Sequence, residues 1–175
     1  MSDWKDRVIL TQDDITVQEV DVIVNAANEG LAPGGGVCGA IHAAAGPALA
    51  EECAEIGHCG TGEAVATGAH DLPAEHVIHT VGPVWGGGAG LVEEELLASC
   101  YRESLDLCAE LGGESIAFPS ISTGTYAFPV DRAAPIAMEA IRDGLNDHGE
   151  IREVRMVCFS AVDLEAYEAA FAKLR

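Results

Sequence analysis

The chain has 175 residues, 49% of them apolar, and this length and composition predict one domain, residues 1–175, with a substantial core. Nine basic residues stand against 29 acidic ones, so the formal net charge is −20 at pH 7. A field of that sign repels nucleic-acid backbones and anionic membranes. Because no basic stripe offsets it, we exclude non-specific binding to either.

No stretch of the sequence approaches the roughly 18 apolar residues of a membrane span, and residues 1–10 lack the pattern of a signal peptide. We therefore expect a cytoplasmic protein. The six cysteines, at positions 38, 53, 59, 100, 108 and 158, form no C-x-x-C pair and no zinc-site spacing. We expect reduced core thiols and no metal site. A disulfide framework is the weaker alternative, because a chain of this length can build a core without one.

Taken in chain order, short β-branched and apolar runs predict strands at 8–11, 22–25, 63–67, 76–81, 116–118 and 154–159. Apolar residues at helical spacing predict helices over 39–55, 93–111, 130–147 and a last segment that carries Leu164, Tyr167, Phe171 and Leu174. Strands that alternate with helices indicate an α/β fold. Its sheet should be largely parallel, covered by helices on both faces, with strand 63–67 at an edge.

Three local signals refine this order. Pro47 is expected to kink the first helix or to start a new one. Asp14 stands where a short helical turn can begin, and the glycine-rich residues 86–90 predict a flexible loop.

Ligands of such sheets lie beyond the carboxyl ends of the strands, where three predicted loops begin, at 26–36, 120–129 and 160–163. The first loop contains Gly34, Gly35 and Gly36 and runs into a helix. Glycines let backbone N–H groups point into a concavity at the positive end of the helix dipole. This is a place that suits a phosphate.

The second loop is a further anion cradle, because it offers the hydroxyls of serine and threonine and the backbone N–H groups around a glycine. Each loop alone is better explained as a simple glycine-containing connection. Two such loops at neighbouring strand ends, however, predict a diphosphate. The amides of Asn25 and Asn28 suit the hydroxyls of a sugar, although asparagines also stabilise turns.

Residues 34–39 also match the G-x-G-x-x-G of dinucleotide-binding enzymes, but the match is weak. Residues 26–33 separate the strand from the glycines, and Glu51, Glu52 and Glu55 lie on the predicted helix instead of ending the next strand. A hydride-transfer enzyme is therefore the weaker alternative.

Longer motifs carry a specific resemblance: DDIT (13–16), DVIVNAAN (21–28), GGGVCGAIHAAAG (34–46), TGEA (61–64), LPAEHVIHTVGPVW (72–85) and AFPSISTGTYAFP (117–129). Over nearly its whole length the chain resembles the macrodomain family, and specifically the bacterial-type branch of O-acetyl-ADP-ribose deacetylases and protein mono-ADP-ribosylhydrolases. The resemblance implies a three-layer α/β/α sandwich with a mixed, largely parallel sheet. It also implies ADP-ribose or an ADP-ribose conjugate as the ligand and no cofactor, and we expect a monomer.

Carried over by position, the resemblance implies that Asp14 holds the adenine amino group beside the Ile15 backbone, and that Phe159 stacks on adenine. Asn28 would hold the distal ribose, and His42 is expected to be structural. Two groups of residues would contact the diphosphate from opposite sides: Gly35, Gly36 and Val37 on one, and Ser122, Thr123, Gly124, Thr125 and Tyr126 on the other.

Position 38 departs from the family pattern. Hydrolytic members have an aspartate there, the acid thought to position or activate the attacking water, whereas this chain has Cys38. A free thiol, with a reference pKa of about 8.5, is mostly protonated at neutral pH and accepts hydrogen bonds weakly. A helix N-terminus can lower that pKa, so a thiolate base or nucleophile is conceivable. The preferred interpretation is retained ADP-ribose binding with weak, phosphate-assisted or absent hydrolysis.

Two hypotheses from different classes remain. One is a hydrolase that removes ADP-ribose or acetyl from an ester, with Asn28 and Cys38 at the catalytic positions. The other is a reader that only binds ADP-ribose or its conjugates.

The acidic residues are spread along the chain, which is typical of the solvated surface of a halophilic protein. At low ionic strength, where the Debye length exceeds about 10 Å, these carboxylates repel one another. We therefore expect the melting temperature to rise as potassium chloride is added, measured by scanning fluorimetry from dilute to molar salt. A melting temperature that stays flat over that range would show that the acidity serves another purpose.

Overall fold

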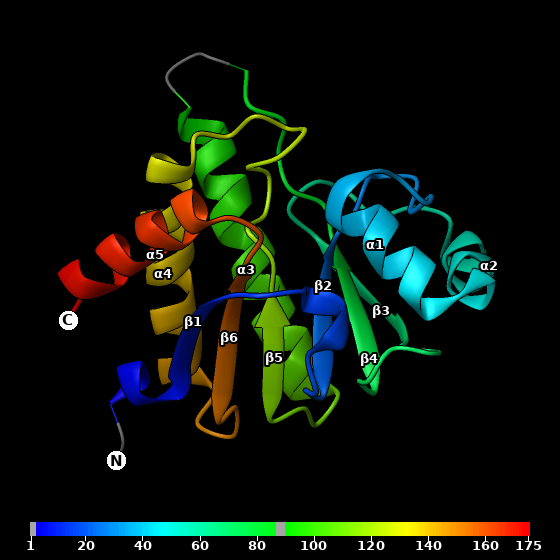
Figure 1. Cartoon of the computed structure of the whole chain (residues 1–175), viewed down its shortest axis with the longest axis horizontal. Coiled ribbons are helices and arrows are strands. Elements are labelled where there is room, and N and C mark those ends of the chain that lie inside the picture. Colours follow the sequence, from blue (N-terminus) through cyan, green and yellow to red (C-terminus); the bar gives the residue numbers. More distant parts are fainter. Residues whose placement is uncertain (1–2, 87–89) are drawn as a thin grey trace.

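Within residues 3–86 and 90–175, which the computed structural model describes, six strands form one sheet in the middle of the molecule (Figure 1). The predicted loop at 86–90 lies largely outside the described residues. The strands lie in the order β1 (Val8–Gln12), β6 (Glu153–Cys158), β5 (Ser115–Phe118), β2 (Val22–Ala26), β4 (His76–Thr80) and β3 (Ala64–Gly68). Neighbouring strands are parallel except for β3, which is antiparallel to β4 at the edge. The predicted mixed, largely parallel sheet is confirmed, and so is its edge strand.

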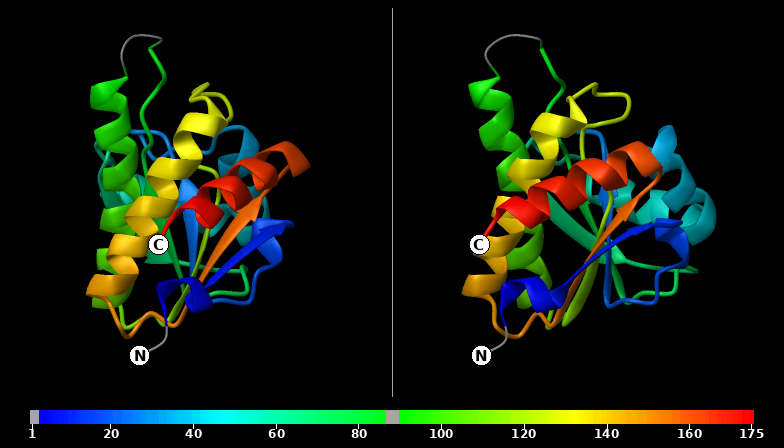
Figure 2. Two further views of the ribbon diagram at one scale, coloured as in Figure 1. Left: turned by 90° about the vertical axis from the view of Figure 1, so that its left-hand side faces the viewer. Right: turned by 60° about the vertical axis from the view of Figure 1, so that its left-hand side comes forward.

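The helices cover both faces of the sheet (Figures 1 and 2). On one face lie α1 (Gly36–Ala45) and α2 (Pro47–Ile56), and on the other lie α3 (Leu91–Glu110), α4 (Val130–Asp147) and α5 (Ala161–Lys173). Short 3-10 helices, η1 (Trp4–Arg7) and η2 (Ile15–Val17), flank β1. This is the predicted α/β/α sandwich.

Side chains that alternate along the central strands separate the core into two layers. In β2, Val22 and Val24 pack with residues of α3, α4 and α5, whereas Ile23 packs with residues of α1 and α2. In β4, Ile78 packs on the side of α3, α4 and α5, and Val77 packs on the side of α1 and α2. These strands are apolar on both faces because both faces are covered.

Proline and glycine set the limits of the first two helices. Gly46 has φ +89 and ends α1, and Pro47 begins α2 at a position where its missing N–H is not needed. Pro47 thus starts a new helix, one of the two outcomes expected for it. The first helix begins at Gly36, earlier than the predicted residue 39, because Gly36, Val37 and Cys38 belong to its first turn and Gly35 is its N-cap.

The order of the strands positions the candidate ligand loops. Because β2, β5 and β6 are adjacent and parallel, the three segments that follow them leave the same edge of the sheet. All six cysteines are buried and unpaired, as predicted. Among the described residues, no helix has the length and apolar character needed to cross a bilayer.

Candidate functional site

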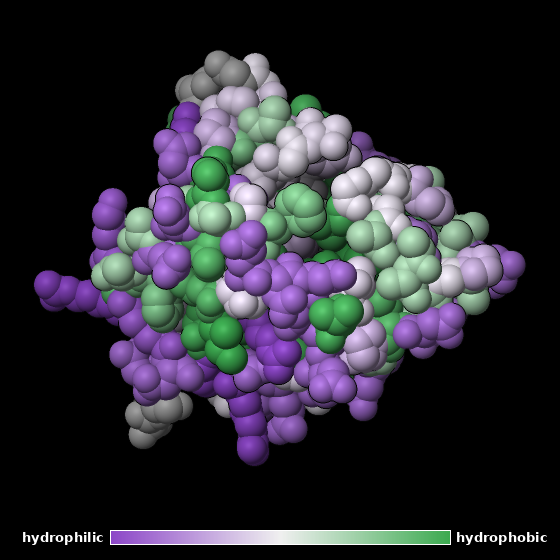
Figure 3. All heavy atoms as spheres, in the orientation of Figure 1, coloured by the Kyte–Doolittle hydropathy of each residue, from purple (hydrophilic) through white to green (hydrophobic). Residues whose placement is uncertain are grey.

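A cavity of about 1030 Å³ opens at this edge of the sheet, between the amino end of α1 and the segments that follow β5 and β6. The surface is hollowed there in Figure 3. All the residues for which the resemblance implies a ligand contact or a catalytic position line it: Asp14, Ile15, Asn28, Gly35, Gly36, Val37, Cys38, Ser122, Thr123, Gly124, Thr125, Tyr126 and Phe159. The structure therefore brings these residues together, and the contact that each makes with a ligand stays a prediction.

The glycine-rich turn presents the amino end of α1 to the cavity. Gly35 is the N-cap, and within the described residues it gives the first N–H groups of the helix no side-chain partner. Gly36 has φ +57, a conformation that favours glycine. Unpaired N–H groups and the positive end of the helix dipole together make a site for an anion.

The loop between β5 and α4 is held from the core side by two buried tyrosines. The hydroxyl of Tyr101 accepts the N–H of Ile121 at 3.2 Å. The hydroxyls of Tyr167 and Thr123 each lie 2.7 Å from Ser120 Oγ. Burial raises the pKa of both tyrosine hydroxyls, so they stay neutral and serve as fixed hydrogen-bonding groups. The core therefore sets the shape of this loop.

The segment that follows β4 braces the same loop from the side. Trp85 donates its backbone N–H to the carbonyl of Tyr126 at 2.8 Å, and its ring lies 4.6 Å from the ring of Phe128. Gly82 approaches so closely that a Cβ there would lie 2.1 Å from Ser122 Oγ. Ser122 has φ +68 although it is not a glycine, which marks strained backbone at the cavity wall.

At the other end of the cavity, η2 is fixed by its own cap. Asp14 Oδ1 accepts the backbone N–H of Thr16 at 2.9 Å and its hydroxyl at 2.6 Å. The short helical turn expected at Asp14 is therefore present. Gln18 holds this turn through its side-chain amide, which donates to the Asp14 carbonyl at 2.9 Å and accepts from the Arg155 guanidinium at 3.0 Å. Phe159 is 88% exposed at the cavity wall, where a flat ring can stack on a ligand.

Asn28 and Cys38 lie side by side around Ala32. The amide of Asn28 donates to the Ala32 carbonyl at 2.7 Å and accepts the Ala32 N–H at 3.0 Å. Cys38 Sγ lies 3.7 Å from the same carbonyl. Asn28 therefore stabilises its own turn, the alternative role open to it, while it also lines the cavity.

The prediction that Asn25 joins Asn28 in holding a sugar is wrong. Asn25 is fully buried, it does not line the cavity, and its amide lies 3.1 Å from His79 Nδ1. Side chains alternate along β2, and this position faces the layer beneath α1 and α2 instead of the cavity. His42 is also buried and outside the lining, as a structural residue would be.

Some lining residues lie outside the three predicted loops and outside the contacts that the resemblance implies, namely Gln12, Asp13, Ala40, Gly82, Pro119 and Val157. Most lie at strand ends or helix starts that become neighbours only through the strand order. The charged lining residues are all acidic, Asp13, Asp14 and Asp163, and none is Lys or Arg. Binding of an anion here must therefore rest on backbone N–H groups, hydroxyls and the helix dipole.

Comparison with known proteins connects this geometry to a family. The model of the macro domain matches residues 24–137. A macro domain-containing protein of Chlorobaculum tepidum is 57% identical over 159 residues, which cover 91% of this chain and 92% of that protein. The O-acetyl-ADP-ribose deacetylase of Cronobacter sakazakii is 50% identical over 166 residues, 93% of this chain and 92% of that protein.

Solved structures show the same likeness. A glycine variant of the Oceanobacillus iheyensis macrodomain with ADPR superposes with a TM-score of 0.88 at 42% identity, over 93% of this chain and 90% of that one. The Trypanosoma brucei macrodomain in complex with ADP-ribose has a TM-score of 0.87 at 40% identity, over 93% of this chain and 68% of that one.

The close approach of Gly39 to the glycine-rich turn yields a testable prediction. A Cβ on residue 39 would lie 2.5 Å from the carbonyl oxygen of Gly34, so Gly39→Ala must displace the turn although alanine favours a helix by about 1 kcal/mol. For ADP-ribose, the ligand that the resemblance implies, we expect at least a tenfold loss of affinity in calorimetric titration, by roughly 1.4 kcal/mol or more. Gly149→Ala, where nothing lies within 4 Å, is the control. Equal affinity in both variants would show that the turn does not bind the ligand.

Proposed function

Because the chain belongs to the macrodomain family, we propose that it binds ADP-ribose and acts on ADP-ribose esters, with catalysis weakened by Cys38. The substrates in view are O-acetyl-ADP-ribose and mono-ADP-ribosylated proteins. The observation that carries the proposal is that two turns with backbone N–H and hydroxyl groups, residues 34–37 at the amino end of α1 and residues 122–126 after β5, line one cavity.

The shape of the cavity supports a ligand with an aromatic end and a sugar end. The exposed ring of Phe159 and the carboxylate of Asp14 suit adenine, which stacks on the one and donates its amino group to the other. The diphosphate would then lie between the two turns. The distal ribose would reach Asn28 and Cys38, where the chemistry takes place.

Hydrolysis at the distal ribose needs a base. Water adds to the ester carbonyl, the bond between the carbonyl carbon and the ribose oxygen breaks, and the departing oxygen takes up a proton. A thiol accepts hydrogen bonds and protons less well than a carboxylate, so Cys38 replaces the usual acid with a poorer base. With no carboxylate on α1, the diphosphate of the ligand is the anion that we propose to assist the reaction, which would make turnover substrate-assisted and slower.

A binding module without turnover is the second candidate function, and the same residue favours it. The carboxylates of the lining belong to the start of η2 and to the first turn of α5, and none belongs to α1. Everything that binds the ligand is common to both functions. Turnover assays on O-acetyl-ADP-ribose and on a mono-ADP-ribosylated protein separate them.

Gly124 offers a test of ligand binding that spares the fold. Nothing lies within 4 Å of a Cβ built on this residue, so Gly124→Val should leave the melting temperature unchanged. In the complex, the added branched side chain would occupy the place where backbone approaches phosphate. Wild type should bind ADP-ribose at micromolar affinity or better, about −8 kcal/mol, and the variant should show no binding in calorimetry. Unchanged affinity would remove residues 122–126 from the binding site.

Cys38→Asp tests the weakened catalysis. If the missing carboxylate limits the reaction, wild type turns over slowly and the variant is faster by roughly 10²- to 10⁴-fold, the usual contribution of general-base assistance. Rates must be compared at saturating substrate, because a new charge beside the diphosphate also weakens binding. Asn28→Ala should lower both affinity and rate.

Cys38→Ala separates the remaining roles of position 38. A fast wild type with an inactive Cys38→Ala variant would make the thiol the catalytic group and contradict the proposal. A fast wild type equalled by Cys38→Ala would show that position 38 takes no part in the reaction. A slow wild type that aspartate accelerates is the result we expect.

A further inference from the structure

A row of buried polar side chains lies behind Cys38 and crosses three adjacent strands of the sheet. Asn25 belongs to β2, His79 to β4 and Thr67 to β3, and Asn25 and His79 are register partners. The first two are fully buried and Thr67 is 3% exposed. Leaving a buried polar group without a partner is costly, and in this row both ring nitrogens of His79 and the hydroxyl of Thr67 have partners, so the direction of these bonds follows from the groups that can only donate or only accept.

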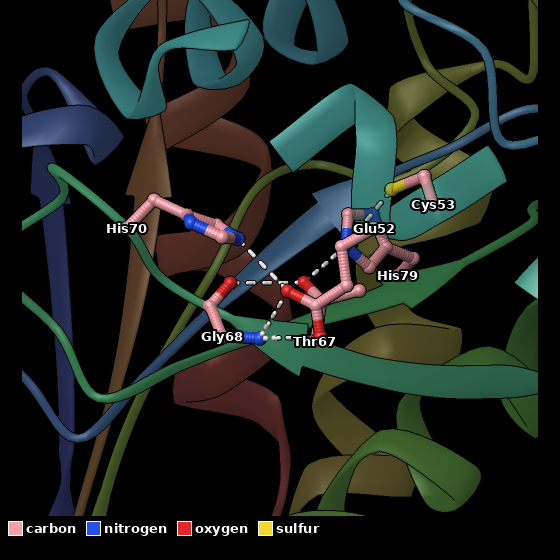
Figure 4. Close-up of polar contacts among 6 residues, drawn as sticks. All are labelled: Glu52, Cys53, Thr67, Gly68, His70 and His79. Carbon is pink, nitrogen blue, oxygen red and sulfur yellow. Dashed lines mark hydrogen bonds and ion pairs between the residues drawn. The ribbon is translucent and has the colours of Figure 1, made fainter. Parts of the chain in front are cut away.

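The backbone carbonyl of Gly68 fixes the direction at the outer end (Figure 4). A carbonyl can only accept, so the hydroxyl of Thr67 donates to it at 3.0 Å. The oxygen of Thr67 then accepts from His79 Nε2, which lies 2.9 Å away. The proton of the imidazole therefore sits on Nε2, and Nδ1 is an acceptor.

Gly68 is itself held in place from the surface. The carboxylate of Glu52 accepts its N–H at 3.1 Å and lies 2.8 Å from His70 Nε2, as Figure 4 shows. Cys53 Sγ lies 3.7 Å from His79 Nε2 and is a weak second partner of that proton. The outer end of the row is thus anchored by α2 through the edge strand.

His79 has only one ring proton at neutral pH. Its burial and the neighbouring imidazole of His42 lower its pKa to about 4, while Glu52 acts in the opposite direction. Even well below neutral pH the ring stays uncharged. A single proton on Nε2 is what the direction of the bonds requires.

The tautomer of His79 then sets the direction of the hydrogen bond between Asn25 and residue 38. Because Nδ1 is an acceptor, Asn25 must turn its Nδ2 toward it, at 3.1 Å. The second proton of the same amide nitrogen points at Cys38 Sγ, 3.7 Å away. Asn25 Oδ1 has no hydrogen-bond partner within the described part of the chain. The reverse orientation of the amide would present only an acceptor to position 38.

From this arrangement we infer that Asn25, His79 and Thr67 are positioning residues for position 38, which they supply with one hydrogen-bond donor of fixed direction. Cys38 Sγ accepts that bond, and its own proton faces the Ala32 carbonyl at 3.7 Å. An amide does not exchange its protons with a neighbour during turnover, so the row orients residue 38 and carries no proton away from it. The role of position 38 in turnover rests on the proposed function, but the hydrogen bond does not.

The tautomer of His79 is the direct test, and it needs no ligand and no variant. In ¹⁵N-labelled wild type, two-bond correlations of the imidazole ring distinguish a protonated from an unprotonated nitrogen. We expect protonated Nε2 and unprotonated Nδ1 at neutral pH. A ring with its proton on Nδ1, or a charged ring, would overturn the inference even if ADP-ribose binds and is turned over.

Thr67→Val tests whether the direction is transmitted. The variant removes the acceptor of the Nε2 proton, so the proton of His79 should move to Nδ1. The side-chain amide of Asn25 should then flip and present its oxygen to Cys38, and the Cys38 thiolate should lose a hydrogen-bond donor. Alkylation of Cys38 by iodoacetamide at a fixed neutral pH, followed by mass spectrometry of its peptide, should slow by about tenfold. Thr67→Ser keeps the hydroxyl and should restore both the tautomer and the rate.

Thr80→Val is the matched control. Thr80 follows His79 on β4 and is a buried threonine whose hydroxyl also donates to a backbone carbonyl, that of Glu63 at 2.8 Å. Within the described residues its side chain makes no hydrogen bond to Asn25, His79 or Thr67. It should leave the His79 tautomer and the alkylation of Cys38 unchanged. Equal slowing in Thr67→Val and Thr80→Val, or no slowing in Thr67→Val, would contradict the positioning role.

Discussion

Unpaired backbone N–H groups at the amino end of α1 are the feature on which the rest of the site depends. They are available because Gly35 caps the helix without a side chain, and they face a cavity because the segment that follows β2 brings the start of α1 to the cavity wall. The turn at residues 122–126 adds a second set of polar groups only because β5 is the parallel neighbour of β2. The order of the strands therefore brings two ordinary glycine-containing connections to one cavity, where together they suit an anion.

This way of binding an anion agrees with the charge of the protein. A chain with a net charge of −20 whose cavity lining has carboxylates and neither Lys nor Arg cannot attract a diphosphate through its overall field. Fixed dipoles inside a cavity act over short distances and need no charged side chain. Dissolved salt screens the repulsion from the acidic surface but weakens these buried contacts much less. An acidic exterior and a site built from N–H groups are therefore compatible.

Much of this architecture could be predicted from the sequence, because each element has a strong local signal. β-branched runs predicted the strands, Pro47 predicted a break between two helices, and Asp14 predicted a helical turn that its side chain does cap. The failures have a common cause. The direction in which the Asn25 side chain points depends on which face of the sheet it lies on. The position of Gly82 and Gln12 in the cavity depends on the order of the strands. Neither property can be derived from the neighbouring residues in the sequence.

Position 38 could be identified from the sequence, but its hydrogen-bonding surroundings could not. From the sequence, a cysteine in place of an acid indicates only weaker catalysis, since a thiol is a weaker base and a weaker hydrogen-bond acceptor than a carboxylate. In the fold, the sulfur lies beside an amide whose orientation traces back to the carbonyl of Gly68, a residue on the edge strand that no motif connects to the cavity. A donor held in this way serves sulfur and carboxylate oxygen alike. The surroundings of position 38 are therefore those of an acceptor, which is why exchange of the side chain can change the chemistry while the binding groups of the cavity stay in place.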